Sequence, residues 1–132
     1  MIYLLDTHMF LWTIIDTKRI SDQALSIIEN NENKIIISAI SLWEISLKYA
    51  LGKLNFIGLK PNELMIHAKD LGFDLMPVSP ESAASHYQLN ATWHRDPFDR
   101  MLIWQAIQND ITLISKDENI NKYQSVGLKV IW

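Results

Sequence analysis

Hydrophobic residues in this chain gather into five short, nearly continuous runs, and several of the runs are rich in β-branched side chains. A continuous apolar run of this length predicts a strand buried on both faces, because a strand with one wet face alternates apolar and polar residues. We therefore predict five buried strands, within residues 2–5, 34–38, 72–77, 110–115 and 128–132.

The segments between these runs carry apolar residues at the three- to four-residue spacing of helices, as in 24–28, 45–51, 64–71 and 101–107. Strand and helix patterns alternate along the chain, which predicts an α/β fold. We expect a three-layer α/β/α sandwich, with a central parallel sheet, helices on both faces and right-handed crossovers. The length suits a single domain over residues 1–132, without an internal repeat or a linker.

Composition narrows the possible chemistry. Hydrophobic residues make up 48% of the chain and charged residues 20%, values typical of a globular protein that folds unaided. The chain contains no cysteine, so any metal must bind to oxygen or imidazole ligands. A formal net charge of −3 disfavours a protein that holds nucleic acid by a strongly basic surface. It still allows a nucleic-acid enzyme whose acidic centre is neutralised by a divalent ion.

Membrane and export signals are not evident in the sequence. No run approaches the roughly 20 apolar residues of a membrane span, and the first run meets Asp6 too early for a secretory signal. We expect a cytoplasmic protein. The segment Gly52–Gly58 predicts a helix end followed by a loop. Phe56 is expected to pack into the core there, although Phe56 and Lys53 lining a binding groove is an alternative.

Four carboxylates fall where ligands bind in open parallel sheets, just beyond the carboxyl ends of the strands. Asp6 and Asp117 directly follow strand runs, and Glu44 lies on the helix after the second run. Asp99 lies in the first turn of the helix that Asp96 and Pro97 open, with Asp96 as the N-cap and Asp99 at the third helical position. We expect these four side chains to meet at one edge of the sheet.

Each acid also has an ordinary structural explanation. Asp6 can cap the following helix, Glu44 can close a capping box with Ser41 or pair with Lys48 four residues on, Asp99 can favour the helix dipole, and Asp117 can begin a turn. Together, however, four carboxylates at one edge would repel one another and raise one another's pKa unless a cation were present. Oxygen ligands suit Mg²⁺ or Mn²⁺, and one or two such ions activate water for attack on a phosphodiester.

Other polar residues near these acids are candidates for supporting roles. Thr7 and Ser115 can orient the metal or its water, although a hydroxyl bonded to the local backbone is the more ordinary role. Arg95, Arg100 and Lys116 can contact the phosphate backbone of a nucleic acid, which is RNA by the resemblance described below, or simply balance nearby acids. The histidines lack metal-ligand spacing, and His94 is expected to be a solvated loop residue. Helices around Trp12 and Trp43 are expected to form a docking groove, with Leu11 and Ile15 beside Trp12.

Four sequence blocks, in order, resemble the PIN-domain ribonucleases, and within them the VapC-type toxins of toxin-antitoxin pairs. The blocks are Leu4–His8, Ile37–Ile45, His94–Ile103 and Leu113–Asp117, and the resemblance covers essentially the whole chain. It implies a PIN-like nuclease domain that cleaves RNA with Mg²⁺ or Mn²⁺, and Asp6, Glu44, Asp99 and Asp117 as catalytic metal ligands. It also implies homodimerisation and inhibition by a small cognate antitoxin that covers the groove near Trp12 and Trp43.

Two features qualify this resemblance. Trp104 stands where similar sequences usually carry a small residue, which concerns the packing or the groove and not the metal site. The functional alternative is a PIN-like module that binds RNA or protein without cutting. The presence of all four acids favours the enzyme.

Overall fold

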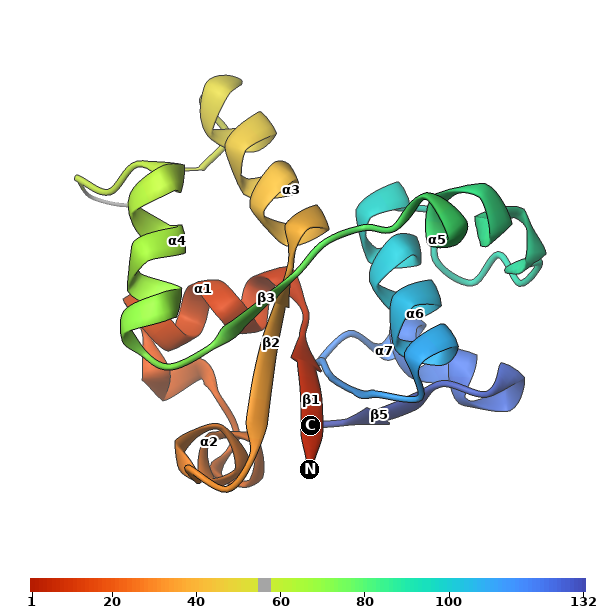
Figure 1. Cartoon of the computed structure of the whole chain (residues 1–132), viewed down its shortest axis with the longest axis horizontal. Coiled ribbons are helices and arrows are strands. Elements are labelled where there is room, and N and C mark those ends of the chain that lie inside the picture. Colours follow the sequence, from red (N-terminus) through yellow and green to blue (C-terminus); the bar gives the residue numbers. More distant parts are fainter. Residues whose placement is uncertain (55–57) are drawn as a thin grey trace.

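The computed structural model describes residues 1–54 and 58–132, whose strands form one five-stranded sheet (Figure 1). The strand order is β3-β2-β1-β4-β5, and every neighbouring pair is parallel. Each strand lies inside a predicted apolar run. Their bounds are β1 Ile2–Leu5, β2 Lys34–Ser38, β3 Asp74–Met76, β4 Thr112–Ile114 and β5 Lys129–Ile131.

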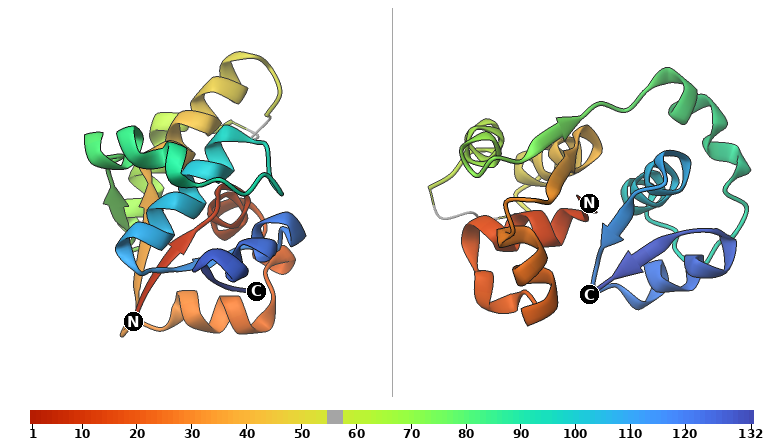
Figure 2. Two further views of the ribbon diagram at one scale, coloured as in Figure 1. Left: turned by 90° about the vertical axis from the view of Figure 1, so that its right-hand side faces the viewer. Right: turned by 60° about the horizontal axis from the view of Figure 1, so that its bottom comes forward.

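Helices cover both faces of the sheet, so the predicted three-layer α/β/α sandwich is confirmed (Figure 2). One layer holds α1 Thr7–Ile15, α2 Asp22–Glu29, α3 Ala39–Ala50 and α4 Pro61–Asp70. The other holds α6 Pro97–Asn109 and α7 Glu118–Asn121, and α5 Pro80–Ser85 packs against α6. Short 3₁₀ turns complete the described residues at η1 Thr17–Arg19, η2 His86–Gln88 and η3 Lys122–Val126.

The two layers explain why the strand runs are continuous. Tyr3 and Leu5 of β1 belong to the core cluster under α1, α2 and α4, whereas Leu4 belongs to the cluster under α6. Ile36 and Ile37 of β2 divide between the two clusters in the same way. Successive strand residues point to opposite faces, so both sets must be apolar when both faces are buried.

The parallel order brings several chain segments to the same edge of the sheet. Asp6 follows β1, α3 follows β2, and Asp117 follows β4 after two residues. Gly52, at a φ of +71°, ends α3 in the left-handed conformation that glycine tolerates. The expectation for Phe56 concerns a residue outside the described ones. Within residues 1–54 and 58–132, each helix is too short or too polar to cross a membrane.

Candidate active site

Asp6 is placed by the junction of β1 and α1. Its Oδ1 accepts a hydrogen bond from the Met9 amide at 2.8 Å, so the capping role is confirmed. The residue is only 5% exposed. Burial raises the pKa of the Asp6 carboxyl above its ordinary value, despite hydrogen bonds from Ser115 and Met9 that oppose the shift, and the nearby Asp117 raises it further.

Glu44 is held inside the protein by two donors. Its Oε1 accepts a hydrogen bond from the Thr7 hydroxyl at 2.7 Å, and its Oε2 pairs with Lys48, as the four-residue spacing predicts. The capping box with Ser41 is wrong, because α3 begins earlier and Ser38 is its N-cap. Burial lowers the pKa of Lys48, but the hydrogen bond and charge of Glu44 outweigh this and leave it raised.

Asp96 and Asp99 divide the tasks that their spacing predicts. The Oδ1 atom of Asp96 accepts hydrogen bonds from the amides of Phe98 and Asp99, at 2.8 and 3.1 Å, and this confirms Asp96 as the N-cap of α6. The Asp99 side chain is thereby left for other contacts. Burial raises the pKa of Asp99 to about 7, and the charge of Asp96 adds to the shift while His94 opposes it.

Asp117 caps α7 with one oxygen and faces the other acids with the second. Its Oδ1 accepts a hydrogen bond from the Asn119 amide at 2.7 Å, and its Oδ2 lies 3.0 Å from Nε2 of His94. The same Nε2 lies 3.0 Å from Oδ2 of Asp99. Because Nδ1 of His94 accepts a hydrogen bond from the Asp96 amide, Nε2 is the ring nitrogen that carries a proton.

The expectation for His94 is therefore wrong. Its side chain is 13% exposed and bridges two of the predicted acids, instead of lying in solvent. Only its position two residues before the helix cap hinted at this role, and a loop histidine has the same appearance in sequence. Side-chain atoms of His94, Asp99 and Asp117 lie within 4.8 Å of one another. The two carboxylates suit a divalent ion, whereas Nε2 of His94 would have to lose its proton before it could bind one.

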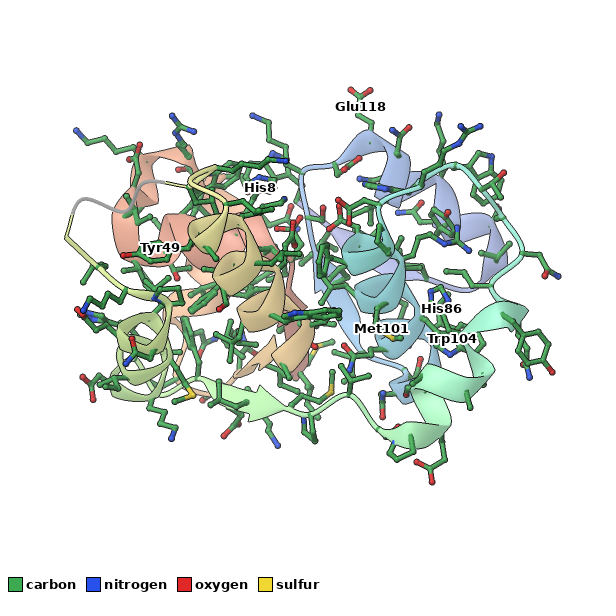
Figure 3. The ribbon with its side chains drawn as sticks, turned by 90° about the horizontal axis from the view of Figure 1, so that it is seen from above. His8, Tyr49, His86, Met101, Trp104 and Glu118 are labelled. Atoms are coloured by element: carbon green, nitrogen blue, oxygen red, sulfur yellow. The ribbon has the colours of Figure 1, made fainter. Side chains whose placement is uncertain are left out.

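Three of the four predicted acids line one pocket of about 370 Å³, namely Asp6, Asp99 and Asp117. Glu44 is not among the lining residues, yet its negative charge acts on Asp99 and raises the pKa of that carboxyl. The rest of the described lining is aromatic or basic, and consists of His8, Trp12, Arg19 and Lys116. Figure 3 shows His8 and Glu118 toward the same side of the molecule, with His86 and Trp104 on the other.

The two candidate hydroxyls contact carboxylates. Ser115 is fully buried, donates to Asp6 and accepts a hydrogen bond from the Asp117 amide at 3.1 Å, so it has both a site contact and a backbone contact. Thr7 bonds to Glu44, and not to the local backbone as its more ordinary role would have it. Each hydroxyl thus positions an acid that belongs to a different element.

The Arg100 side chain has a structural role, which corrects its expected availability to an RNA backbone. Its guanidinium donates to the backbone carbonyls of Leu89, Ala91 and His94 at distances of 2.6 to 3.1 Å. It thereby fastens the segment before α6. Arg95 and Lys116 are exposed, and Lys116 borders the acidic pocket.

The tryptophans named for docking do not share one groove, so that expectation is corrected. Trp12 lines a pocket with Leu11 and Ile15 as predicted, whereas Trp43 lines pockets with Ile40 and Met101 on another part of the surface. The ring of Trp43 packs edge-on against Phe98, at a centroid distance of 5.3 Å. Trp104 donates to Ser85 and so ties α6 to α5, away from the acids.

Comparison with known proteins places the chain in a family. Residues 3–126 match the model of the PIN domain. The chain belongs to the PIN domain family. It is 24% identical over 136 residues to "Ribonuclease VapC22" of Mycobacterium tuberculosis, covering 98% of the chain and 97% of that protein.

Solved structures share the PIN domain fold over the full chain. One is VapBC2 of Rickettsia felis bound to a promoter DNA fragment, with a TM-score of 0.66 at 19% identity and coverage of 100% of this chain and 99% of that one. Another is VapBC-1 of nontypeable Haemophilus influenzae, with a TM-score of 0.67 at 17% identity and coverage of 99% and 97%. At these identities the likeness concerns the PIN domain fold.

Proposed function

We propose that this PIN domain is an endoribonuclease that depends on Mg²⁺ or Mn²⁺ and acts as the toxin of a toxin-antitoxin pair. The observation that carries the proposal is the shared pocket of Asp6, Asp99 and Asp117. Burial raises the pKa of Asp99 there to about 7, and the charges of Asp96, Glu44 and Asp6 add to the shift. Such an arrangement is costly for folding unless a cation compensates it. The related ribonuclease of M. tuberculosis supports RNA as the substrate.

The residues divide the work of such a site. Asp6, Asp99 and Asp117 would hold the ion, His94 adjoins the last two, and Glu44 adds negative charge from outside the pocket lining. A bound divalent ion supplies an activated water and stabilises negative charge on the scissile phosphate. Because Asp6 and Asp117 each use an oxygen to cap a helix, their positions are set before any ligand arrives. Thr7 and Lys48 do the same for Glu44.

The proposed protein partner is a small antitoxin that covers the Trp12 pocket. This pocket includes Leu11, Ile15 and Leu54, and it shares His8, Trp12 and Arg19 with the acidic pocket. A segment docked there would also close the approach to the acids. Similarity to solved VapBC structures, one of them from a family of toxin-antitoxin systems, supports the proposal.

Homodimerisation is proposed through the apolar surface around Trp43, which is 60% exposed. Ile40, Val78, Ala83 and Met101 extend this surface between α3, α5 and α6. Exposed apolar surface of this kind marks association sites. Trp43→Glu should lower the molar mass measured by light scattering from that of a dimer to that of a monomer.

The test of the nuclease is a cleavage assay on mixed RNA with Mg²⁺ or Mn²⁺, repeated with EDTA and with Asp99→Asn. We expect cleavage that stops in both controls. Retention of RNA without cutting, in the presence of either ion, would instead identify a non-cleaving PIN-like RNA-binding module. Copurification of the chain with the product of a neighbouring small gene tests the antitoxin separately.

A further inference from the structure

The pocket that contains the acids has a lining of mixed chemistry. His8, Trp12, Arg19 and Lys116 line it together with Asp6, Asp99 and Asp117. An acidic pocket that served only a metal would need no such lining. Aromatic rings interleaved with cations are typical of surfaces that bind single-stranded nucleic acid.

Three aromatic rings, His8, Trp12 and Trp132, form what we call the aromatic wall. The rings of His8 and Trp12 lie one helical turn apart on α1, with centroids 6.0 Å apart and planes inclined by 34°. The ring of Trp132 contacts that of Trp12 edge-on, with centroids 6.2 Å apart and planes inclined by 62°, which helps to fix the Trp12 ring. His8 is exposed and Trp12 is half-buried, which leaves the first ring accessible and the second anchored.

Two cations accompany the aromatic wall. The Nζ atom of Lys116 lies 5.8 Å from the ring centroid of Trp132, and Lys116 immediately precedes Asp117. Arg19 is largely exposed, and its Nε lies 3.4 Å from Asp16. Positive charge is therefore placed next to the acids, where it can attract the phosphate that flanks a bound base.

We propose that the aromatic wall is a subsite for one unpaired nucleobase next to the scissile phosphate, with Lys116 and Arg19 contacting the adjoining backbone. A base can stack on Trp12 or His8 without regard to its identity, because every base has a π-face. A base in a duplex is already stacked and paired, so it cannot enter a pocket of about 370 Å³. The subsite therefore selects single-stranded or splayed RNA.

This inference rests on the proposed nuclease function and adds the residues that choose the substrate. The same aromatic wall adjoins the pocket proposed for the antitoxin, so a protein segment is the competing occupant. The charge of Lys116 distinguishes RNA from a protein segment as the occupant. A peptide that docked by apolar contact would not need Lys116, whereas a polyanion would lose binding and salt dependence when that charge is removed.

The test measures binding of fluorescent single-stranded RNA to the full chain carrying Asp99→Asn, with Mn²⁺ present, by anisotropy. A set of oligonucleotides, each lacking one base at a successive position, locates any stacked base. We expect one position where loss of the base weakens binding about tenfold. Trp12→Ala should also weaken binding of the intact RNA about tenfold. In this variant, loss of the base at the sensitive position should have no further effect. Trp12→Phe should restore both the affinity for intact RNA and the sensitivity to loss of that base.

Further variants protect the test against misfolding and non-specific effects. His8→Ala changes an exposed side chain. It should reduce the contribution of the base at the sensitive position to binding, without lowering the melting temperature of the protein. Lys116→Gln should reduce the slope of log Kd against the logarithm of the salt concentration by about one. Tyr87→Ala removes an aromatic that is 77% exposed on η2, outside the pocket, and is the matched control that should bind as the parent does.

Several results would overturn the subsite. They are duplex RNA binding as tightly as the single strand, no sensitive position in the base-deletion set, or Trp12→Ala binding RNA normally while losing the antitoxin complex. The proposed function fails by a different result, the absence of metal-dependent cleavage by the unmodified chain. Cleavage without base dependence would therefore reject the subsite and keep the nuclease.

Discussion

The Oδ1 atom of Asp96 accepts a hydrogen bond from the backbone amide of Asp99 at 3.1 Å. The Asp96 carboxylate thus caps α6. It also fixes the backbone of Asp99, whose own carboxylate lines the pocket. Oδ2 of Asp99 lies 3.0 Å from the His94 ring. Two acids three residues apart therefore differ in what their carboxylates contact.

The first prediction tests this separation. Asp96→Ala should lower the free energy of unfolding by about 1 kcal/mol, because a cap is lost, and should leave most of the cleavage rate. Asp96→Asn should recover the stability, since asparagine caps equally well. Asp99→Asn should fold and lose nearly all cleavage. Melting curves and cleavage rates of the three proteins decide the matter, and the reverse pattern would exchange the two assignments.

The second prediction concerns pH in the absence of metal. Burial is the main cause that raises the pKa of Asp99 from 3.8 to about 7, and the charge of Asp96 is the second. The folded state therefore binds more protons than the unfolded state between these values, so the free energy of unfolding falls as pH rises from about 4 to about 7. Asp99→Asn should reduce this dependence to the part that the raised pKa of Asp6 contributes, and above pH 7 it should stabilise the protein by at most about 4 kcal/mol.

Chemical denaturation in EDTA across this pH range provides the measurement. Asp70→Asn, which alters an exposed acid at the end of α4, is the matched control and should keep the pH dependence of the unmodified protein. Parallel pH profiles for Asp99→Asn and the unmodified protein would show that the Asp99 carboxyl is not perturbed.

The third prediction concerns metal addition. Mg²⁺ or Mn²⁺ should raise the melting temperature, because an ion bound only by the folded state stabilises it, by about 2.7 kcal/mol at 100 times its Kd. The effect should shrink in Asp6→Asn and in Asp117→Asn, which each remove one pocket carboxylate. Thermal scans with each ion suffice, and an equal rise in all three proteins would place the ion elsewhere.

The fourth prediction concerns the Thr7 hydroxyl, which donates to Oε1 of Glu44 at 2.7 Å. Thr7→Val keeps the shape of the side chain but leaves a buried carboxylate with one donor fewer, which should cost about 1–3 kcal/mol of stability. Cleavage should fall with it, because Glu44 is less well positioned. Thr7→Ser should restore both quantities. A valine variant as active and stable as the parent would show that the bond has no role.

The fifth prediction compares two neighbouring arginines. Arg100→Met removes the donors to the carbonyls of Leu89, Ala91 and His94, and should cost at least about 2 kcal/mol of stability. Arg95→Met alters an exposed side chain and should change stability by no more than about 0.5 kcal/mol. Urea denaturation of both variants tests this, and equal midpoints would contradict the structural role of Arg100.

The sequence by itself determined the five strands, the three layers and the helix starts at Asp6 and Asp96, whereas the start of α3 lies earlier than the Ser41 spacing indicated. Continuous apolar runs specify strands buried on both faces, and all five strands lie inside them. The caps by Asp6 and Asp96 were equally readable, because each accepts a hydrogen bond from an amide three residues away. Asp117 was expected to begin a turn, and it caps the short helix α7. Local spacing carries that information, and the parallel order then brings strand ends and helix starts together.

Only the tertiary structure decided which side chains meet. Thr7 and Glu44 are 37 residues apart, and His94 and Asp117 are 23 apart, so neither contact has a signature in local spacing. In the sequence Arg100 could not be distinguished from a free cation, whereas in the fold its guanidinium donates to three backbone carbonyls. Trp12 and Trp43 resembled parts of one groove, and the packing of their helices placed them on different surfaces. Such contacts depend on how helices pack across the sheet, which the pattern of one chain segment does not encode.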